Sequence, residues 1–331
     1  MSEITLKALQ FSSLCLIPNA GEHDRFEGFL VNLNGSKGTT PIKPIGGRVP
    51  DEAMALGTIC DRLFSPDSPP RTISHEGAVY LASRSDMLDG RTMYMLNPIA
   101  SDKPSLAKIM QQPLLAKHVH GLCSRPGIFL IASEHRQTRE TYGAAAYLSV
   151  LDSKRGLGVA IDRDPVFNLG GQHGESAFSA HVDIANTTSA SSVIRTQPSV
   201  IFMSALENEH EAHILLRAAA NNIPCIVTVH AKDIPDAITT VTHLASKELN
   251  GTEDILQRAH FAQQINGALH IKLNETDPSK ESRKIFDAKP KTDDASKLQT
   301  ALIDLDHEIL LSAIEHQTNQ LKSSLQAANT Q

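Results

Sequence analysis

Polar side chains follow two short apolar runs in the middle of the chain, and their positions indicate where chemistry could occur. Ser199–Met203 and Pro224–Val229 are continuous apolar runs of the kind that form strands buried on both faces. Between them, residues 207–220 carry apolar side chains at helical spacing. Two parallel strands joined by one helix form a βαβ unit, whose ligands bind beyond the carboxyl ends of the strands. Ser204–Asn208 and His230–Lys232 are therefore predicted to lie at a site.

The histidines do not form a recognisable metal-binding pattern. His210 and His213 lie three residues apart on the predicted helix, but the sequence there is not H-E-x-x-H and implies no third ligand. His118 and His120 lie in an amphipathic segment, and a packed or solvated role is favoured for all four residues. His230 has two interpretations, a structural hydrogen bond or a functional contact. No metal site is expected.

The composition is that of an ordinary globular protein with room for two domains. The chain has 331 residues, enough for two separate hydrophobic cores. The net charge is -6 and no block of like charge stands out, so nucleic acid is not expected as a partner. The four cysteines are scattered and form no C-x-x-C pair, which favours reduced thiols in a cytosolic protein. The apolar runs are too short to cross a bilayer, and no signal-peptide pattern begins the sequence.

The region around residues 195–232 resembles a known family. Arg195 and Pro198-Ser199 precede the first strand, Ser204–Asn208 follows it, an Ala-rich helix comes next, and Val229–Lys232 ends the second strand. This order is similar to the second half of the motor domain of PilT- and GspE-type secretion ATPases, which serve type II secretion, type IV pili and type IV secretion. In that family the corresponding turn reads Gly-Glu-x-Arg-Asp, and the second strand ends in Leu-His-Thr-Asn.

The resemblance implies an α/β fold with a RecA-like P-loop NTPase core, a smaller α+β (PAS-like) N-terminal domain and a C-terminal helix. The expected domains are residues 1–104, the small domain and linker; 105–274, the motor domain; and 275–331, a charged linker followed by an amphipathic helix over about 295–326. Residues 96–106 resemble the family's Pro-rich inter-domain linker. In the small domain we expect strands over Ile4–Pro18, Phe26–Asn32, Ala78–Leu81 and Arg91–Leu96, and a helix over Asp51–Phe64.

The phosphate-binding turn that the resemblance implies has lost its usual residues. It lies between a buried strand, Gly127–Ala132, and a helix that we expect over Thr141–Leu151. A Walker A turn reads G-x-x-x-x-G-K-[ST], whose glycines let backbone N–H groups surround the phosphates. In this frame Ser133 and Thr138 stand at the glycines, Arg139 at the lysine and Glu140 at the magnesium-binding hydroxyl. A Cβ atom at each glycine position and a negative charge at Glu140 would disfavour a nucleotide.

The other family positions have changed as well. Arg163, beside Asp164, stands at the glutamate that assists attack by water, Ser204-Ala205 replaces Gly-Glu, and Glu207 replaces the arginine. Of the family's Leu-His-Thr-Asn sequence only His230 remains. We therefore expect no catalytic residues, and a vestigial nucleotide site composed of Ser133, Glu134, His135, Arg136, Gln137, Thr138, Arg139, Glu140, Thr141, Arg163, Asp164, Ala205, Glu207 and His230.

Three classes of function follow. The favoured one is a member of the secretion ATPase family with degenerate Walker motifs, inactive or weakly active, that serves as an assembly or regulatory subunit and needs no cofactor. The alternative is an active ATPase that uses altered site residues with ATP and magnesium. The third, an unrelated α/β enzyme, is disfavoured by the shared order of residues 96–273. The resemblance also implies a ring, six-membered in the family, made of this chain alone or with an active paralogous ATPase. Such a ring would lie in the cytoplasm and be peripheral to the inner membrane through membrane-embedded secretion or pilus machinery.

Overall fold

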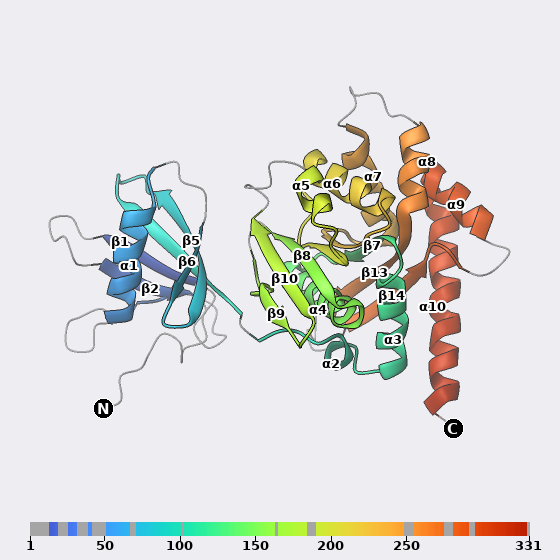
Figure 1. Ribbon diagram of the computed structural model, residues 1–331, viewed down its shortest axis with the longest axis horizontal. Helices are drawn as coiled ribbons and strands as arrows, with labels where there is room; N and C mark the ends of the chain where they lie inside the picture. The colour runs from blue at the N-terminus through green and yellow to red at the C-terminus, as the bar shows by residue number, and fades with distance from the viewer. Residues whose placement is uncertain are drawn as a thin grey trace. The chain divides into compact units, whose positions relative to one another are not determined.

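A computed structural model describes residues 13–18, 26–31, 39–41, 51–66, 71–100, 102–162, 165–183, 190–247, 255–274, 281–290 and 295–329. The chain divides into two compact units. The smaller comprises Met1–Asp102 and Asp164–Asn168, and the larger comprises Lys103–Arg163 and Leu169–Gln331 (Figure 1).

The smaller unit is an antiparallel sheet covered by one helix. The sheet has six strands in the order β3-β2-β1-β6-β5-β4, and helix α1 packs on β1 and β2. Ala53, Leu56 and Cys60 of α1 are fully buried at helical spacing, so one stripe of the helix faces the sheet. The bounds are β1 Ser13–Pro18, β2 Phe26–Val31, β3 Thr39–Pro41, α1 Asp51–Leu63, β4 Arg71–His75, β5 Ala78–Asp86 and β6 Thr92–Ile99.

The predicted elements of the smaller unit are confirmed where the structure describes them. β2, β5, β6 and α1 match their predicted ranges to within a few residues at most ends, although β5 extends to Asp86. The predicted strand over Ile4–Pro18 is seen as β1, and its first nine residues lie outside the described part. Gly57 permits the close approach of α1 to the sheet, because a Cβ atom there would lie 2.7 Å from the Phe26 ring.

The larger unit contains an eight-stranded sheet in the order β14-β13-β7-β12-β11-β8-β10-β9. The six central strands are parallel, and β14 and β9 pair antiparallel at the two edges. Every residue of β7, β11 and β12 is buried, as continuous apolar runs require of strands covered on both faces. The bounds are β7 Gly127–Ala132, β8 Gly156–Asp162, β9 Gly171–His173, β10 Ala177–Asp183, β11 Val200–Met203, β12 Pro224–Val229, β13 Ile265–Leu273 and β14 Glu281–Asp287.

Helices cover both faces of this sheet (Figure 1). On one face α4 crosses β7, β8, β11 and β12 closely, since a Cβ atom on Gly143 would lie 2.6 Å from Cγ2 of Thr228. The helices that contribute to the core on the other face include α6, α7, α8, α9 and α10. The bounds are α2 Leu106–Met110, α3 Pro113–Cys123, α4 Arg136–Lys154, α5 Ala190–Arg195, α6 Glu209–Ala220, α7 Ile234–Lys247, α8 Ile255–Gln264, α9 Ala295–Asp304 and α10 His307–Asn329.

The C-terminal region differs from the expectation in two ways. The stretch predicted to be a charged linker contains β14, which pairs with β13 along its whole length. The single helix predicted over 295–326 is two helices, because Leu305 has a left-handed φ of 54°. Asp306 caps the second helix by accepting from the N–H groups of Glu308 and Ile309, both at 3.1 Å.

In the middle of the chain, strands β9 and β10 lie where no strand was predicted.

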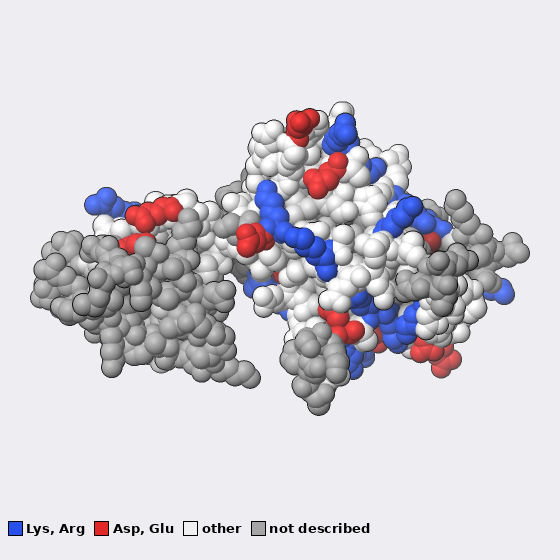
Figure 2. Space-filling view, turned by 90° about the horizontal axis from the view of Figure 1, so that it is seen from below, with Lys and Arg blue, Asp and Glu red and all other residues white. Residues whose placement is uncertain are grey.

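No helix in the described part of the chain combines the length and hydropathy that a membrane span requires. On the face shown in Figure 2, basic and acidic side chains are interspersed.

Candidate functional site

The turns that follow β7, β8, β11 and β12 meet along one edge of the larger sheet, the edge formed by the carboxyl ends of its parallel strands. Three backbone hydrogen bonds join them: Ser133 N–H donates to Val229 O at 3.3 Å, Ser204 N–H to Ile161 O at 3.1 Å, and Leu206 N–H to Thr228 O at 3.2 Å. The βαβ interpretation of β11, α6 and β12 is therefore correct, since β11 and β12 are parallel neighbours. This edge is where open α/β sheets bind their ligands.

The turn after β7 is short and contains no residue with a left-handed backbone. Helix α4 begins at Arg136, the fourth position of the eight-residue frame Ser133–Glu140, so only Ser133–His135 separate strand from helix. None of these three residues has a positive φ. Ser133 is fully buried, and its Oγ accepts from the His135 N–H at 3.2 Å. The four residues that follow Ser133 are exposed: Glu134, His135, Arg136 and Gln137.

Glu140 is the most unusual residue at this edge. It is 3% exposed, one turn before Gly143 on the side of α4 that faces the sheet, and its Oε1 has no hydrogen-bond partner. Burial first, and then the negative charge of Asp162, raise the pKa of this carboxyl to about 8, against the opposite influence of Arg136, Arg139 and the Thr228 hydroxyl. The sequence led us to expect a negative charge at Glu140, but with this pKa the Glu140 carboxyl is largely neutral at pH 7.

Two more buried polar atoms near Glu140 make no hydrogen bond of ordinary geometry. They are Nε of Arg139 and Oγ1 of Thr228, on the part of β12 that packs against α4, although the Thr228 hydroxyl is near enough to the Glu140 carboxyl to lower its pKa. Burial lowers the pKa of the Arg139 guanidinium, while the Glu140 and Glu207 carboxylates raise it. Beside them, Asp162 lies 3.8 Å from His181 Nε2 across β8 and β10. Unpartnered buried polar atoms cost free energy, so their presence here makes this end of the sheet a candidate site.

The turn after β11 is held by a carboxylate that the sequence analysis missed. Glu211 is 2% exposed and accepts from the N–H groups of Glu207 at 2.6 Å and Asn208 at 3.2 Å, and from Asn208 Nδ2 at 2.8 Å. In return, Asn208 Oδ1 accepts from the Glu211 N–H at 3.0 Å. This is a capping box at the start of α6. Its signal was in the sequence, since Asn208 and Glu211 are three residues apart at the start of a predicted helix.

His230 lies at the end of β12, as predicted, and is exposed. The residue after it, Ala231, is buried, and Lys232 N–H donates to Asp236 Oδ2 at 3.1 Å at the start of α7. Asp236 N–H donates in turn to Asp233 Oδ1 at 2.8 Å. The turn after β12 is thus ordered by its own two aspartates, and His230 is not part of that network.

The structure places most of the predicted site residues on this edge. Ser133 and Glu140 are buried; Thr138, Arg139, Thr141 and Ala205 are partly buried; Glu207 and His230 are exposed. Thr141 donates through its hydroxyl to Gln137 O at 2.7 Å within α4. Arg163 and Asp164 lie outside the described residues. The described residues contain no group of three or more His, Cys, Asp or Glu side chains arranged to hold a metal ion.

No family model matches this sequence, and no curated protein is similar to it in sequence. Similarity appears in the fold. The ATPase DotB of Legionella pneumophila shares 14% identity with a TM-score of 0.68 over 92% of this chain and 84% of that chain. DotB of Yersinia pseudotuberculosis shares 14% identity with a TM-score of 0.59 over 94% and 82% of the two chains. The pilus retraction motor PilT, solved with bound ADP, shares 15% identity with a TM-score of 0.67 over 95% of this chain and 90% of the PilT chain.

These similarities confirm the expected fold class. The α/β sheet of the larger unit matches the DotB and PilT ATPase fold, and the smaller α+β unit and the C-terminal helix fit it as well. At 14–15% identity the likeness concerns the fold alone.

Proposed function

We propose that this chain is a secretion- or pilus-type ATPase homologue that has lost tight nucleotide binding and serves as an assembly or regulatory subunit of a type IV secretion, type II secretion or type IV pilus machine. The observation that carries the proposal is the turn after β7. Helix α4 begins at the fourth position of the phosphate-binding frame, which leaves three residues, none of them glycine, to surround a phosphate.

The residues present do not fit the phosphates of a nucleotide. A phosphate bound beside the buried carboxyls of Glu140 and Asp162 would bring negative charge to a place that already raises the pKa of Glu140. Arg139 stands where a lysine would reach the phosphates, and its half-buried guanidinium lies near Glu140 and Glu207. Hydrolysis also needs a magnesium ion and a positioned water, and neither Ala205 nor Glu140 supplies the usual group.

Calorimetry and thermal unfolding with MgATP test the loss of binding. We expect no micromolar site and no rise in Tm at millimolar MgATP, because a ligand stabilises a protein only in proportion to its binding. The matched variant carries Ser133→Gly, Thr138→Gly, Arg139→Lys and Glu140→Thr, and a gain of magnesium-dependent binding in that variant would locate the loss in these four residues. Tight MgATP binding by the unaltered chain would contradict the proposal and support the alternative, an active ATPase with altered site residues.

The assembly role rests on the retained two-unit fold. DotB and PilT are described as an ATPase and a pilus motor, and their fold covers nearly all of this chain. We propose a ring, homomeric or shared with an active paralogous ATPase, whose heterologous contacts close on themselves and which docks to membrane-embedded machinery from the cytoplasm. Light scattering of the protein alone, and then mixed with that paralogue, should show masses above the 35.9 kDa monomer. A monomer in both experiments would contradict the assembly role.

A further inference from the structure

A histidine and two serines form a hydrogen-bonded network where α3 packs on α4. His120 of α3 lies between the two: Ser149 Oγ of α4 is 2.9 Å from its Nδ1, and Ser124 Oγ, at the end of α3, is 3.3 Å from its Nε2. All three residues are partly exposed. The network lies apart from the turn after β7, because Ser149 is near the C-terminal end of α4 and that turn precedes its first residue.

The hydrogen positions in this network follow from one of its bonds. The Ser124 hydroxyl donates to the His120 carbonyl at 2.8 Å, so its hydrogen is not available to the ring. Nε2 then carries the ring hydrogen and donates to Ser124 Oγ, because a neutral imidazole has one donor nitrogen and one acceptor nitrogen. Nδ1 is left as the acceptor, and the Ser149 hydroxyl donates to it. Ser124 therefore fixes the tautomer in which Nδ1 can take up a proton.

The His120 ring is neutral at pH 7. Burial lowers its pKa from the ordinary value of 6.5, and the positive charge of Lys154, on the same helix as Ser149, lowers it further. A hydroxyl that donates to the bare nitrogen of a neutral imidazole is the arrangement in which a general base activates a serine nucleophile. A third group that orients the base completes it, and Ser124 is that group.

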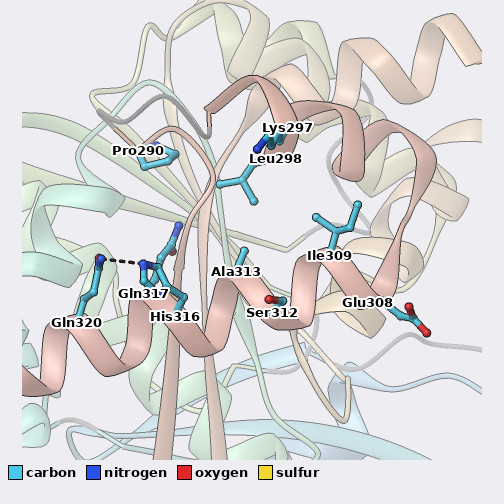
Figure 3. Close-up of a pocket in the computed structure, with 10 residues that line it drawn as sticks. All are labelled: Pro290, Lys297, Leu298, Glu308, Ile309, Ser312, Ala313, His316, Gln317 and Gln320. Atoms are coloured by element: carbon cyan, nitrogen blue, oxygen red, sulfur yellow. Dashed lines mark hydrogen bonds between the residues drawn. The ribbon is translucent and has the colours of Figure 1, made fainter.

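A second serine and histidine, in the groove between α9 and α10, show that proximity alone does not give this arrangement. The groove has a volume of about 510 Å³ and is lined by Ser312 and His316, four residues apart on α10. Figure 3 shows the His316 ring bonded instead to Gln320, whose Nε2 donates to the ring Nε2 at 2.8 Å. The figure draws no bond from Ser312 to that ring. Ser312 is exposed, so it is a matched comparison for Ser149.

We propose that Ser149 is a nucleophile that accepts acyl groups from activated esters or thioesters, with His120 as its general base and Ser124 as a positioning residue. Ser149 Oγ attacks the carbonyl carbon of the acyl donor while its proton passes to His120 Nδ1. The bond from that carbon to the leaving oxygen or sulfur then breaks, the leaving group departs with the proton, and Ser149 carries an ester. This inference does not depend on the loss of nucleotide binding.

Acetylation by p-nitrophenyl acetate tests the nucleophile in the full-length chain. Peptide mass spectrometry of acid-quenched samples measures the acetyl group on each serine at pH 7. We expect Ser149 to be acetylated at least about tenfold faster than Ser312. The same ratio should hold for Ser153, an exposed serine on α4 whose hydroxyl donates to Val150 O at 2.9 Å. Equal rates at the three serines, with no more nitrophenol released by the unaltered chain than by Ser149→Ala, would overturn the proposal.

Two positions test the partners of Ser149. His120→Asn retains a hydrogen-bond acceptor and removes the base, so the acetylation rate of Ser149 should fall to that of Ser312. Ser124→Ala removes the group that fixes the tautomer and should slow the reaction several-fold. Ser124→Thr keeps the hydroxyl and should restore the rate. An unchanged rate in a folded His120→Asn chain would overturn the role of the base.

The pH profile of the unaltered chain gives the same test without a substitution. Acetylation of Ser149 should level off above about pH 6.5, because the His120 imidazole is already neutral there. Acetylation of Ser312 should continue to rise with the hydroxide concentration. A Ser149 profile that rises in parallel with that of Ser312 would overturn the proposal, even if His120→Asn does not fold.

Discussion

Two buried glutamates at the same edge of the larger sheet have opposite surroundings. Glu211, in the first turn of α6, is 2% exposed and accepts three hydrogen bonds from the turn after β11. Glu140, in the second turn of α4, is 3% exposed, and its Oε1 accepts none. Burial alone therefore does not distinguish a structural carboxylate from a strained one, and the hydrogen-bond count does.

The comparison shows that the two turns differ in how their buried polar groups are satisfied. The turn after β11 satisfies its backbone through its own side chains. Beside the turn after β7, Arg139 and Glu140 of α4 and Thr228 of β12 each have a buried polar atom without a hydrogen bond of ordinary geometry. Such atoms call for an explanation, which the proposed loss of nucleotide binding would supply.

The largest effect should come from titrating Glu140. Its pKa is about 8 in the folded chain against an ordinary value of 4.5, so the folded state holds the proton more tightly. The contribution of this carboxyl to the free energy of unfolding is therefore highest below about pH 4.5. It falls by roughly 5 kcal/mol as the pH rises to 8. Glu140→Gln should remove that loss. Urea unfolding of both chains at pH 5, 7 and 9 measures it, and parallel pH profiles would show that the folded carboxyl is ionised.

A smaller effect should come from Glu211. Glu211→Ala leaves the N–H groups of Glu207 and Asn208 without their acceptor at a partly buried turn, which should cost about 3 kcal/mol. Glu209→Ala is the control, because Glu209 lies in the same first turn and is partly exposed. We expect a change within about 0.5 kcal/mol for the control. Equal losses in the two variants, measured by urea unfolding at pH 7, would show that α6 depends on negative charge near its N-terminus rather than on the capping box.

Asn208 sharpens the same comparison, because it provides the other half of the box. Asn208→Ala removes one acceptor for the Glu211 N–H and should cost about 1 kcal/mol. Asn208→Ser retains an N-cap acceptor and should recover most of it. Thermal unfolding of the three chains measures the difference, and no recovery with serine would contradict a capping role.

His230 should have the smallest effect. Its side chain is exposed at the end of β12, and Asp233 and Asp236 order the turn that follows. We expect His230→Ala to change the free energy of unfolding by less than about 0.5 kcal/mol. A larger loss in urea unfolding would favour a structural hydrogen bond for His230, and an unaltered stability with lost binding to a partner would favour a functional contact.

Continuous apolar runs were enough to predict the central strands. The runs Gly127–Ala132, Ser199–Met203 and Pro224–Val229 are continuous and apolar, and a strand buried on both faces needs little else, so β7, β11 and β12 were predictable to within a residue. β14 was not, because Glu281–Asp287 carries four charged residues and an edge strand exposes much of its side-chain surface. Its pairing with β13 depends on contacts that local sequence does not encode.

The sequence by itself determined the fold class and which turns follow the parallel strands, including the residues of the turn after β7. Each depends on local patterns, such as apolar runs, helical spacing and the identity of single residues in a frame. Only the tertiary structure decided that Glu140 is buried beside Asp162 and largely neutral, and that Gln317 pairs with the backbone of Asp287. Burial and long-range pairing depend on which elements meet in space. Residues 140 and 162, like residues 287 and 317, are far apart in the sequence, and only the packing of helices on the sheet brings them together.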